Sequence, residues 1–135
     1  MGCGSGILSI AAAKLGYGPV AGFDVDQEAV DASVENAEKN GVKVDFFKFA
    51  LGRAGTEASP VGPADLVAAN ILGPLLIRFA DEIVPYVGRN LIVSGILTDL
   101  YPDVLAAYEA RGLKEVSRKT LGEWTTGLLT RKGRF

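Results

Sequence analysis

Hydrophobic patterns of helical and of strand-like spacing alternate along the chain, and this alternation limits its fold more than any other feature. Apolar residues at helical spacing predict helices over about residues 6–15, 27–40, 74–83 and 100–108. Short apolar runs predict strands over about residues 19–23, 42–47, 64–69 and 90–94. Strands that alternate with helices favour βαβ units, so we expect an α/β fold with a mostly parallel, doubly wound sheet.

The second predicted helix carries clear start and stop signals. Asp26 is a favourable N-cap residue, and Gly41 is typical of a helix end. We expect Val30, Val34 and Ala37 on the inward face of this helix.

The last part of the chain has a different pattern, with two strand-like segments and no helix between them. Residues 113–120 and 124–131 read as two strands around Gly122-Glu123, which predicts a C-terminal antiparallel hairpin. Glycines and prolines over residues 52–63 predict a surface loop.

Composition excludes several classes of protein. Histidine is absent, which removes His-based triads and imidazole general bases, and the single cysteine excludes an internal disulfide and a multi-cysteine metal site. No metal is therefore expected. A net charge of −2 argues against direct nucleic-acid binding, and no apolar run approaches the ~18 residues that span a membrane. The 135 residues predict one cytoplasmic domain, residues 1–135, that acts on or with a small molecule.

Glycine recurs at the start of the chain. Gly2, Gly4 and Gly6 form a G-x-G-x-G run directly before the first predicted helix. Such glycines let a ligand approach main-chain N–H groups closely, although a tight turn alone would explain them too. The dinucleotide fingerprint G-x-G-x-x-G would need a glycine at Ile7, which disfavours a dinucleotide-binding dehydrogenase domain.

An acidic residue follows the next predicted strand. Asp24 lies eighteen positions after Gly6, at the carboxyl end of the strand over 19–23. Ligands of doubly wound folds bind at that edge, where a carboxylate can accept hydrogen bonds from both ribose hydroxyls. The alternative is that Asp24 or Asp26 only caps the following helix.

Five short segments occur in a characteristic order. They are Gly2-Cys3-Gly4-Ser5-Gly6-Ile7-Leu8-Ser9-Ile10-Ala11-Ala12, Gly22-Phe23-Asp24-Val25-Asp26, Ala69-Asn70-Ile71-Leu72, Ser94-Gly95-Ile96-Leu97 and Gly122-Glu123-Trp124. The first two resemble motifs of class I S-adenosylmethionine-dependent methyltransferases. The last three narrow the resemblance to the bacterial enzymes that methylate ribosomal protein eleven of the large subunit.

The resemblance implies a Rossmann-like fold, a cofactor and a set of site residues. The cofactor would be S-adenosylmethionine, with S-adenosylhomocysteine as product, and the substrate would be amino groups of a ribosomal protein. Asn70 would be catalytic, because its side-chain oxygen can accept hydrogens from the amine; a turn-forming role is its alternative. Phe49 would pack on adenine or fill the core. The residues expected to contact the cofactor are Gly2, Gly4, Gly6, Asp24, Val25, Ala50, Leu51 and Asn70.

The resemblance also concerns the front edge of the chain. In the family an apolar first strand precedes the glycine loop, whereas here Met1 stands directly before Gly2. We therefore expect a sheet whose first strand is missing and a domain that is incomplete at its N-terminus. Two hypotheses follow: the catalytic domain of a protein methyltransferase, or an inactive or partner-completed cofactor-binding module whose sheet takes a strand from another chain.

Overall fold

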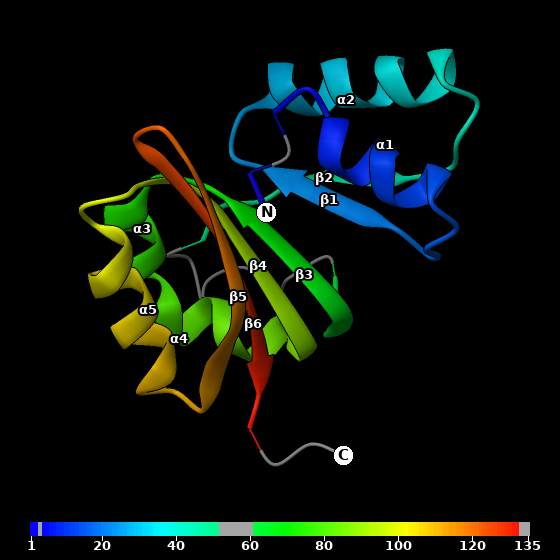
Figure 1. Ribbon diagram of the computed structural model, residues 1–135. Coiled ribbons are helices and arrows are strands. Elements are labelled where there is room, and N and C mark those ends of the chain that lie inside the picture. The colour runs from blue at the N-terminus through cyan, green and yellow to red at the C-terminus, as the bar shows by residue number, and fades with distance from the viewer. Residues whose placement is uncertain (3, 52–60, 133–135) are drawn as a thin grey trace. The chain divides into compact units, whose positions relative to one another are not determined.

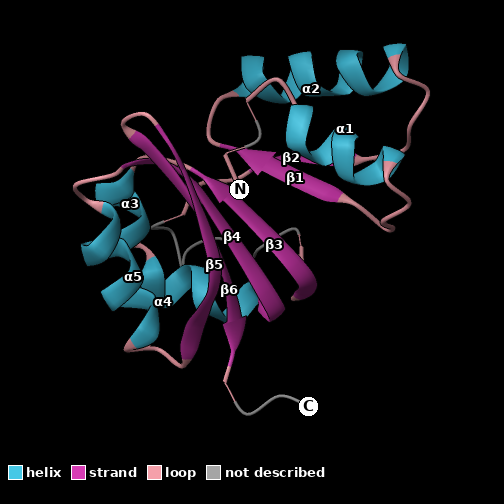
Figure 2. Ribbon diagram, in the orientation of Figure 1, coloured by secondary structure: helices cyan, strands magenta, loops and turns pink. Residues whose placement is uncertain are grey.

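The computed structural model describes residues 1–2, 4–51 and 61–132, and it divides into two compact units, Met1–Val61 and Gly62–Phe135. Each unit has its own sheet and its own helices (Figures 1 and 2). Most of the loop predicted over 52–63 lies outside the described residues. Within the described ranges, no helix is long and apolar enough to cross a membrane.

The first unit is a βαβ arrangement preceded by one helix. Its two strands are parallel and adjacent, with Asp24 opposite Lys48, and the longer helix packs against both strands and the first helix. Its elements in chain order are α1 (Ile7–Lys14), β1 (Ala21–Asp24), α2 (Gln27–Lys39) and β2 (Asp45–Lys48). The rings of Phe23 and Phe49 meet edge to face, with 5.3 Å between their centroids. The buried apolar side chains of this unit are Ile10, Phe23, Val30, Ala37 and Phe49.

Both ends of α2 follow the sequence signals. The Asp26 carboxylate accepts the Glu28 N–H at 3.0 Å and caps the start. At the other end, the N–H groups of Gly41 and Val42 donate to the carbonyls of Glu38 and Ala37. These two bonds form a Schellman motif, which keeps the chain wrapped around the helix end. For this reason β2 begins at Asp45 and not at residue 42 as predicted.

The inward face of α2 differs from the prediction at one position. Val30 and Ala37 are buried as expected, but Val34 is 42% exposed and Ser33 is fully buried. The helix therefore presents residues 30, 33 and 37 to the interior, and the prediction for Val34 was wrong.

The second unit is a four-stranded mixed sheet in the order β3-β4-β6-β5. The pair β3–β4 is parallel, whereas β4–β6 and β6–β5 are antiparallel. Its helices α3, α4 and α5 lie along one face of the sheet (Figure 1). The elements are β3 (Ala64–Asn70), α3 (Gly73–Arg78), α4 (Ala80–Ile83), a 3-10 turn (Val84–Tyr86), β4 (Val87–Leu97), α5 (Tyr101–Glu109), β5 (Leu113–Leu121) and β6 (Trp124–Arg131).

Two boundaries in the second unit differ from the prediction. The helix expected over 74–83 is interrupted at Phe79, whose φ of −99° and ψ of 15° leave the helical region. Strand β4 is longer than the predicted 90–94, because its first residue, Val87, already pairs with Ala64 of β3. Gly88 therefore lies inside the strand.

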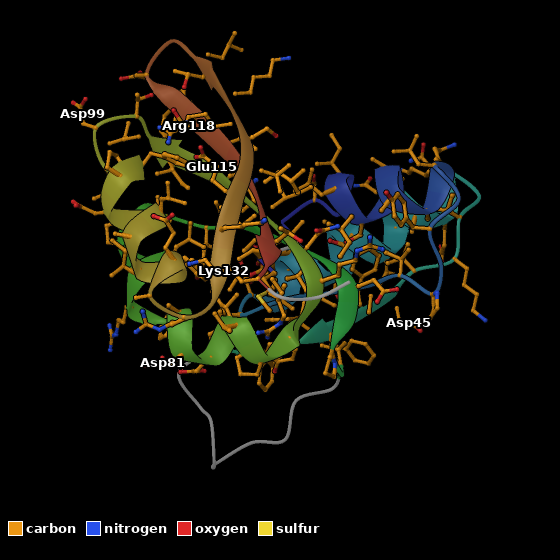
Figure 3. The ribbon with its side chains drawn as sticks, turned by 60° about the horizontal axis from the view of Figure 1, so that its bottom comes forward. Asp45, Asp81, Asp99, Glu115, Arg118 and Lys132 are labelled. Carbon is orange, nitrogen blue, oxygen red and sulfur yellow. The ribbon has the colours of Figure 1, made fainter. Side chains whose placement is uncertain are left out.

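A polar cluster connects the C-terminal hairpin to α5. The Tyr101 hydroxyl and the Arg118 Nε both donate to Glu115 Oε2, at 2.8 and 2.9 Å. The Arg118 guanidinium stacks 4.7 Å from the Tyr101 ring centroid. Figure 3 labels Glu115 and Arg118 of this cluster. Burial opposes ionisation of Glu115, but the bonds from Tyr101 and Arg118 outweigh it and hold the Glu115 pKa below its usual value. The cluster thus favours a charged Glu115.

The predicted fold class is confirmed in its main features: helices alternate with parallel strands, and an antiparallel hairpin closes the chain. The hairpin turns at Gly122-Glu123 as predicted, because Leu121 pairs with Trp124.

Candidate functional site

The glycines that precede α1 have backbone dihedrals in the left-handed region. Gly2, Gly4 and Gly6 have φ angles of 65°, 53° and 82°, a region that residues with a side chain rarely adopt. Gly6 is also the N-cap of α1, and a Cβ there would lie 3.0 Å from the Ser33 Cβ. Beside Gly4 a Cβ would meet nothing within 4 Å, so this part of the loop has open space next to its backbone.

Asp24 holds this loop. It ends β1, and its Oδ2 accepts the Gly4 N–H at 3.0 Å while Oδ1 accepts the Asp26 N–H at 3.0 Å. An ionised carboxylate offers about four lone-pair positions, so two remain for hydroxyl donors. The helix-capping role belongs to Asp26, and Asp24 is separate from it.

Two polar side chains of α2 contact the same loop from the other side. The Ser33 hydroxyl lies 3.0 Å from the Gly4 carbonyl and 2.8 Å from the Ala29 carbonyl, and the Asn36 Nδ2 donates to the Ser5 carbonyl at 2.9 Å. Neither residue is among the site residues predicted from the sequence. A serine at helical spacing between Val30 and Ala37 was the signal that could have identified Ser33.

Other predicted contact residues follow the ends of the two strands in this unit. Val25 comes directly after β1 and is 63% exposed. Ala50 and Leu51 follow β2 and are half-buried. Phe49, by contrast, is only 5% exposed and packs on Phe23, which favours its core role. Cys3, which stands between Gly2 and Gly4 in the sequence, lies outside the described residues.

Asn70 belongs to the second unit, where it is the exposed last residue of β3. It pairs with Ser94 of β4, and the next residue, Gly95, has a φ of +74°. A Cβ on Gly95 would lie 2.6 Å from the Asn70 Oδ1. A glycine at position 95 therefore leaves room for the Asn70 amide.

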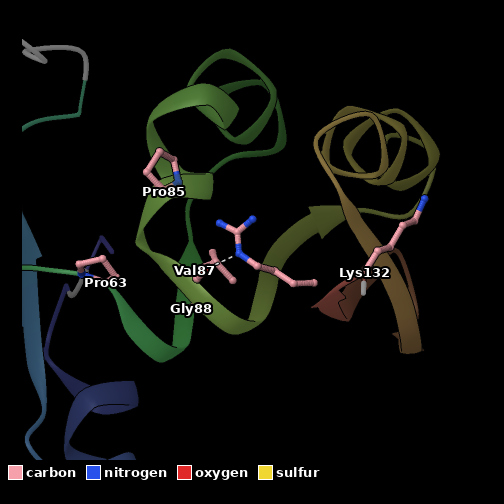
Figure 4. A pocket seen from close by; sticks show the side chains of 6 residues that line it. Pro63, Pro85, Val87, Gly88 and Lys132 are labelled. Atoms are coloured by element: carbon pink, nitrogen blue, oxygen red, sulfur yellow. Dashed lines mark hydrogen bonds between the residues drawn. The ribbon is translucent and has the colours of Figure 1, made fainter. Parts of the chain in front are cut away.

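A hollow of about 470 Å³ in the second unit is distinct from these residues (Figure 4). It lies at the start of β4, whereas Asn70 ends β3, and it is lined by Pro63, Pro85, Val87, Gly88, Arg131 and Lys132. The Arg131 guanidinium is occupied there by the carbonyls of Val84 and Val87. Across the residues that the structure describes, no three acidic, cysteine or histidine side chains gather in a way that could hold a metal ion.

Comparison with known proteins gives the family. A model of the family described as "Ribosomal protein L11 methyltransferase (PrmA)" matches residues 1–132. The chain belongs to the ribosomal protein L11 methyltransferase family. This agrees with the resemblance and not with the dinucleotide-binding alternative.

Two relatives in this family are longer than the chain. It is 45% identical over 109 residues to the ribosomal protein L11 methyltransferase of Chromobacterium violaceum, with 79% of this chain and 34% of that protein aligned. It is 40% identical over 134 residues to the one of Rhizobium meliloti, with 97% of this chain and 46% of that protein aligned. The chain thus spans less than half the length of these relatives.

Solved structures agree with the fold. The ribosomal protein L11 methylase of Lactobacillus delbrueckii subsp. bulgaricus superposes with a TM-score of 0.86 at 30% identity, covering 97% of this chain and 67% of that one. The 16S rRNA methylase RmtB has a TM-score of 0.73 at 22% identity, with 97% and 54% covered, and shares the fold. The predicted Rossmann-like methyltransferase fold is therefore confirmed.

Proposed function

We propose that this chain is the cofactor-binding part of an S-adenosylmethionine-dependent methyltransferase that modifies amino groups of a ribosomal protein. The observation that carries the proposal is the bond from the Gly4 N–H to Asp24. It joins a glycine loop at a helix start to a carboxylate at the end of a parallel strand, which is the arrangement that holds nucleosides in doubly wound folds.

The residues of the first unit fit such a cofactor chemically. Asp24 keeps acceptor positions for two ribose hydroxyls, and the open space beside Gly4 lets a ligand come close to the backbone. The exposed Val25 and the half-buried Ala50 and Leu51 offer apolar surface for an adenine ring. When bound, S-adenosylmethionine supplies a methyl group already activated on a sulfonium, which accounts for a chain that works without histidine.

Asn70 would hold the amine that receives the methyl group. Its amide oxygen accepts a hydrogen bond without adding charge, which suits an amine that must react in its neutral form. The Gly95 backbone beside it has no side chain that could displace the amide oxygen. Removal of the Asn70 amide should therefore affect turnover more than cofactor affinity.

The substrate part of the proposal is supported by the relatives. Their names describe methylation of ribosomal protein L11, and the chain spans 34% and 46% of two of them. A module that binds the cofactor without catalysis is the alternative, because more than half of each relative lies outside the match. Under either hypothesis we propose that residues 1–135 act as one domain.

Calorimetry with S-adenosylhomocysteine, followed by transfer of a labelled methyl group to purified ribosomal protein L11, tests the proposal. We expect Asp24→Ala to weaken S-adenosylhomocysteine binding, because the two hydrogen bonds from the ribose hydroxyls, each worth roughly 0.5–1.5 kcal/mol, would be lost. We expect Asn70→Ala to bind normally and to lose methyl transfer. Absence of S-adenosylhomocysteine binding at millimolar concentration would overturn the proposal, and binding without transfer by the unmodified chain would favour the non-catalytic module.

A further inference from the structure

The glycine loop is held by side chains at three points, two of which come from α2. Asp24 accepts the Gly4 N–H at 3.0 Å, and Asn36 donates to the Ser5 carbonyl at 2.9 Å. The single hydroxyl proton of Ser33 is shared between the Gly4 carbonyl at 3.0 Å and the Ala29 carbonyl at 2.8 Å. We propose that Asn36, assisted by Ser33, is a positioning residue that fixes the direction of the loop N–H groups for the cofactor. This inference rests on the proposed function.

Peptide geometry connects the two carbonyls to the N–H groups of the loop. In a planar trans peptide the C=O of one residue and the N–H of the next point in opposite directions. The bond from Ser33 to the Gly4 carbonyl therefore turns the Ser5 N–H away from α2. The bond from Asn36 to the Ser5 carbonyl does the same for the Gly6 N–H. Both N–H groups lie at the start of α1, where backbone donors favour polar or anionic ligand groups.

Without these contacts the loop has little to keep it in one conformation. Glycine adopts positive and negative φ about equally, so the residues at 4 and 6 do not define the backbone by themselves. Ordering one residue costs about 1–2 kcal/mol of conformational entropy, and a ligand that must order the loop binds correspondingly more weakly. The hydrogen bonds from α2 order the loop before the ligand binds, so ligand binding does not have to supply this entropy.

The position of Asn36 on α2 allows its effect on the loop to be measured apart from any effect on the stability of the fold. Val30, Ser33 and Ala37 form the buried face of α2, whereas the Asn36 side chain is half-buried and reaches outside the helix to the loop. Asn40 provides a matched control, because its Nδ2 donates at 2.8 Å to the Asn36 carbonyl within the same helix end. Both asparagines lose one amide hydrogen bond on change to alanine, but only Asn36 loses a bond to the loop.

The experiment compares Asn36→Ala, Asn36→Asp and Asn40→Ala by amide hydrogen exchange without ligand, by calorimetry with S-adenosylhomocysteine and by urea unfolding. Asn36→Asp keeps the shape and removes the donor. We expect both Asn36 variants to exchange the Gly4 amide, which is hydrogen-bonded to Asp24, severalfold faster and to bind S-adenosylhomocysteine about 2- to 10-fold more weakly. Their urea midpoints should match that of Asn40→Ala, which leaves exchange and affinity unchanged.

Several results would overturn the inference. The inference fails if the Asn36 variants match Asn40→Ala in both loop exchange and affinity for S-adenosylhomocysteine. It also fails if their loop exchange is faster but their affinity is unchanged, because Asn36 would then have a structural role only. Ser33→Ala tests the Gly4 carbonyl independently if the Asn36 variants unfold, and it should raise the exchange rate of the Gly4 amide, which is hydrogen-bonded to Asp24. If the unmodified chain binds no S-adenosylhomocysteine, the proposed function fails, and the exchange comparison still decides whether α2 orders the loop.

Discussion

The two glycines that flank Ser5 should respond differently to the same substitution. Both have left-handed backbones, with φ of 53° at Gly4 and 82° at Gly6. An alanine in this conformation costs about 1–2 kcal/mol relative to glycine. It also restricts the unfolded chain, which returns about 0.4–1 kcal/mol. Because the Gly4 Cβ would meet nothing within 4 Å, we expect Gly4→Ala to lower the free energy of unfolding by only about 1 kcal/mol.

Gly6 adds a packing cost to the same backbone cost. Its Cβ would lie 3.0 Å from the Ser33 Cβ, 3.1 Å from the Ser33 Cα and 3.1 Å from the Phe46 Cζ. The Ser33 Cα and Cβ are fixed by the backbone of α2, so a side-chain rotation cannot move them away. Overpacking of this kind costs about 1–3 kcal/mol, and we expect Gly6→Ala to lose about 2–4 kcal/mol in total.

Urea unfolding followed by circular dichroism measures both variants against the unmodified chain, with equal slopes as the condition for comparing midpoints. Gly4→Ala is the matched control, since it shares the conformation and lacks the contacts. A loss in Gly6→Ala no greater than that in Gly4→Ala would refute the reasoning, because the close approach of α2 to the loop would then contribute nothing.

Two further predictions concern the second unit. Tyr108→Phe removes the bond from the buried hydroxyl to the Leu76 carbonyl at 2.8 Å and should lower the free energy of unfolding by about 0.5–1.5 kcal/mol in urea titration, whereas an unchanged midpoint would contradict the role of that bond. The folded protein holds the Glu115 pKa below its ordinary 4.5, so the unfolded chain binds more protons near that pH. The ionised Glu115 therefore stabilises the folded protein above pH 4.5, and this contribution is lost as the pH falls. Glu115→Gln should flatten this loss in acid unfolding curves, and parallel curves would count against the cluster with Tyr101 and Arg118.

Elements with local signals could be predicted, and the extent of elements that depend on pairing could not. The cap at Asp26, the stop at Gly41 and the turn at Gly122-Glu123 act within a few residues and are visible in the sequence. The start of β4 is different, because Val87 is in a strand only through its pairing with Ala64, more than twenty positions earlier. No pattern around Gly88 contains that information.

The candidate site divides in the same way. The glycine spacing and the acid at the end of β1 were visible, and the structure places Gly4 and Asp24 in contact. Whether Asp24, Val25, Ala50, Leu51 and Asn70 bind cofactor or substrate stays a prediction. Helical spacing could have placed Ser33 on the inner face of α2, but the contacts of Ser33 and Asn36 with the loop about thirty residues earlier are visible only in the folded structure.

The rotation of α2 shows why hydrophobicity gave the wrong inward face. At about 100° per residue, Val34 and Ser33 lie on opposite sides of the line through Val30, so only one can turn fully inward. Burial of the rest of the Val34 side chain would gain at most about 1–2 kcal/mol. The hydrogen bonds from α2 to the two loop carbonyls, each worth about 0.5–1.5 kcal/mol net, would then be lost, and so would the close packing of Ser33 against Gly6. The requirements of the loop therefore outweigh the apolar pattern of the helix, and Ser33 is buried while Val34 remains 42% exposed.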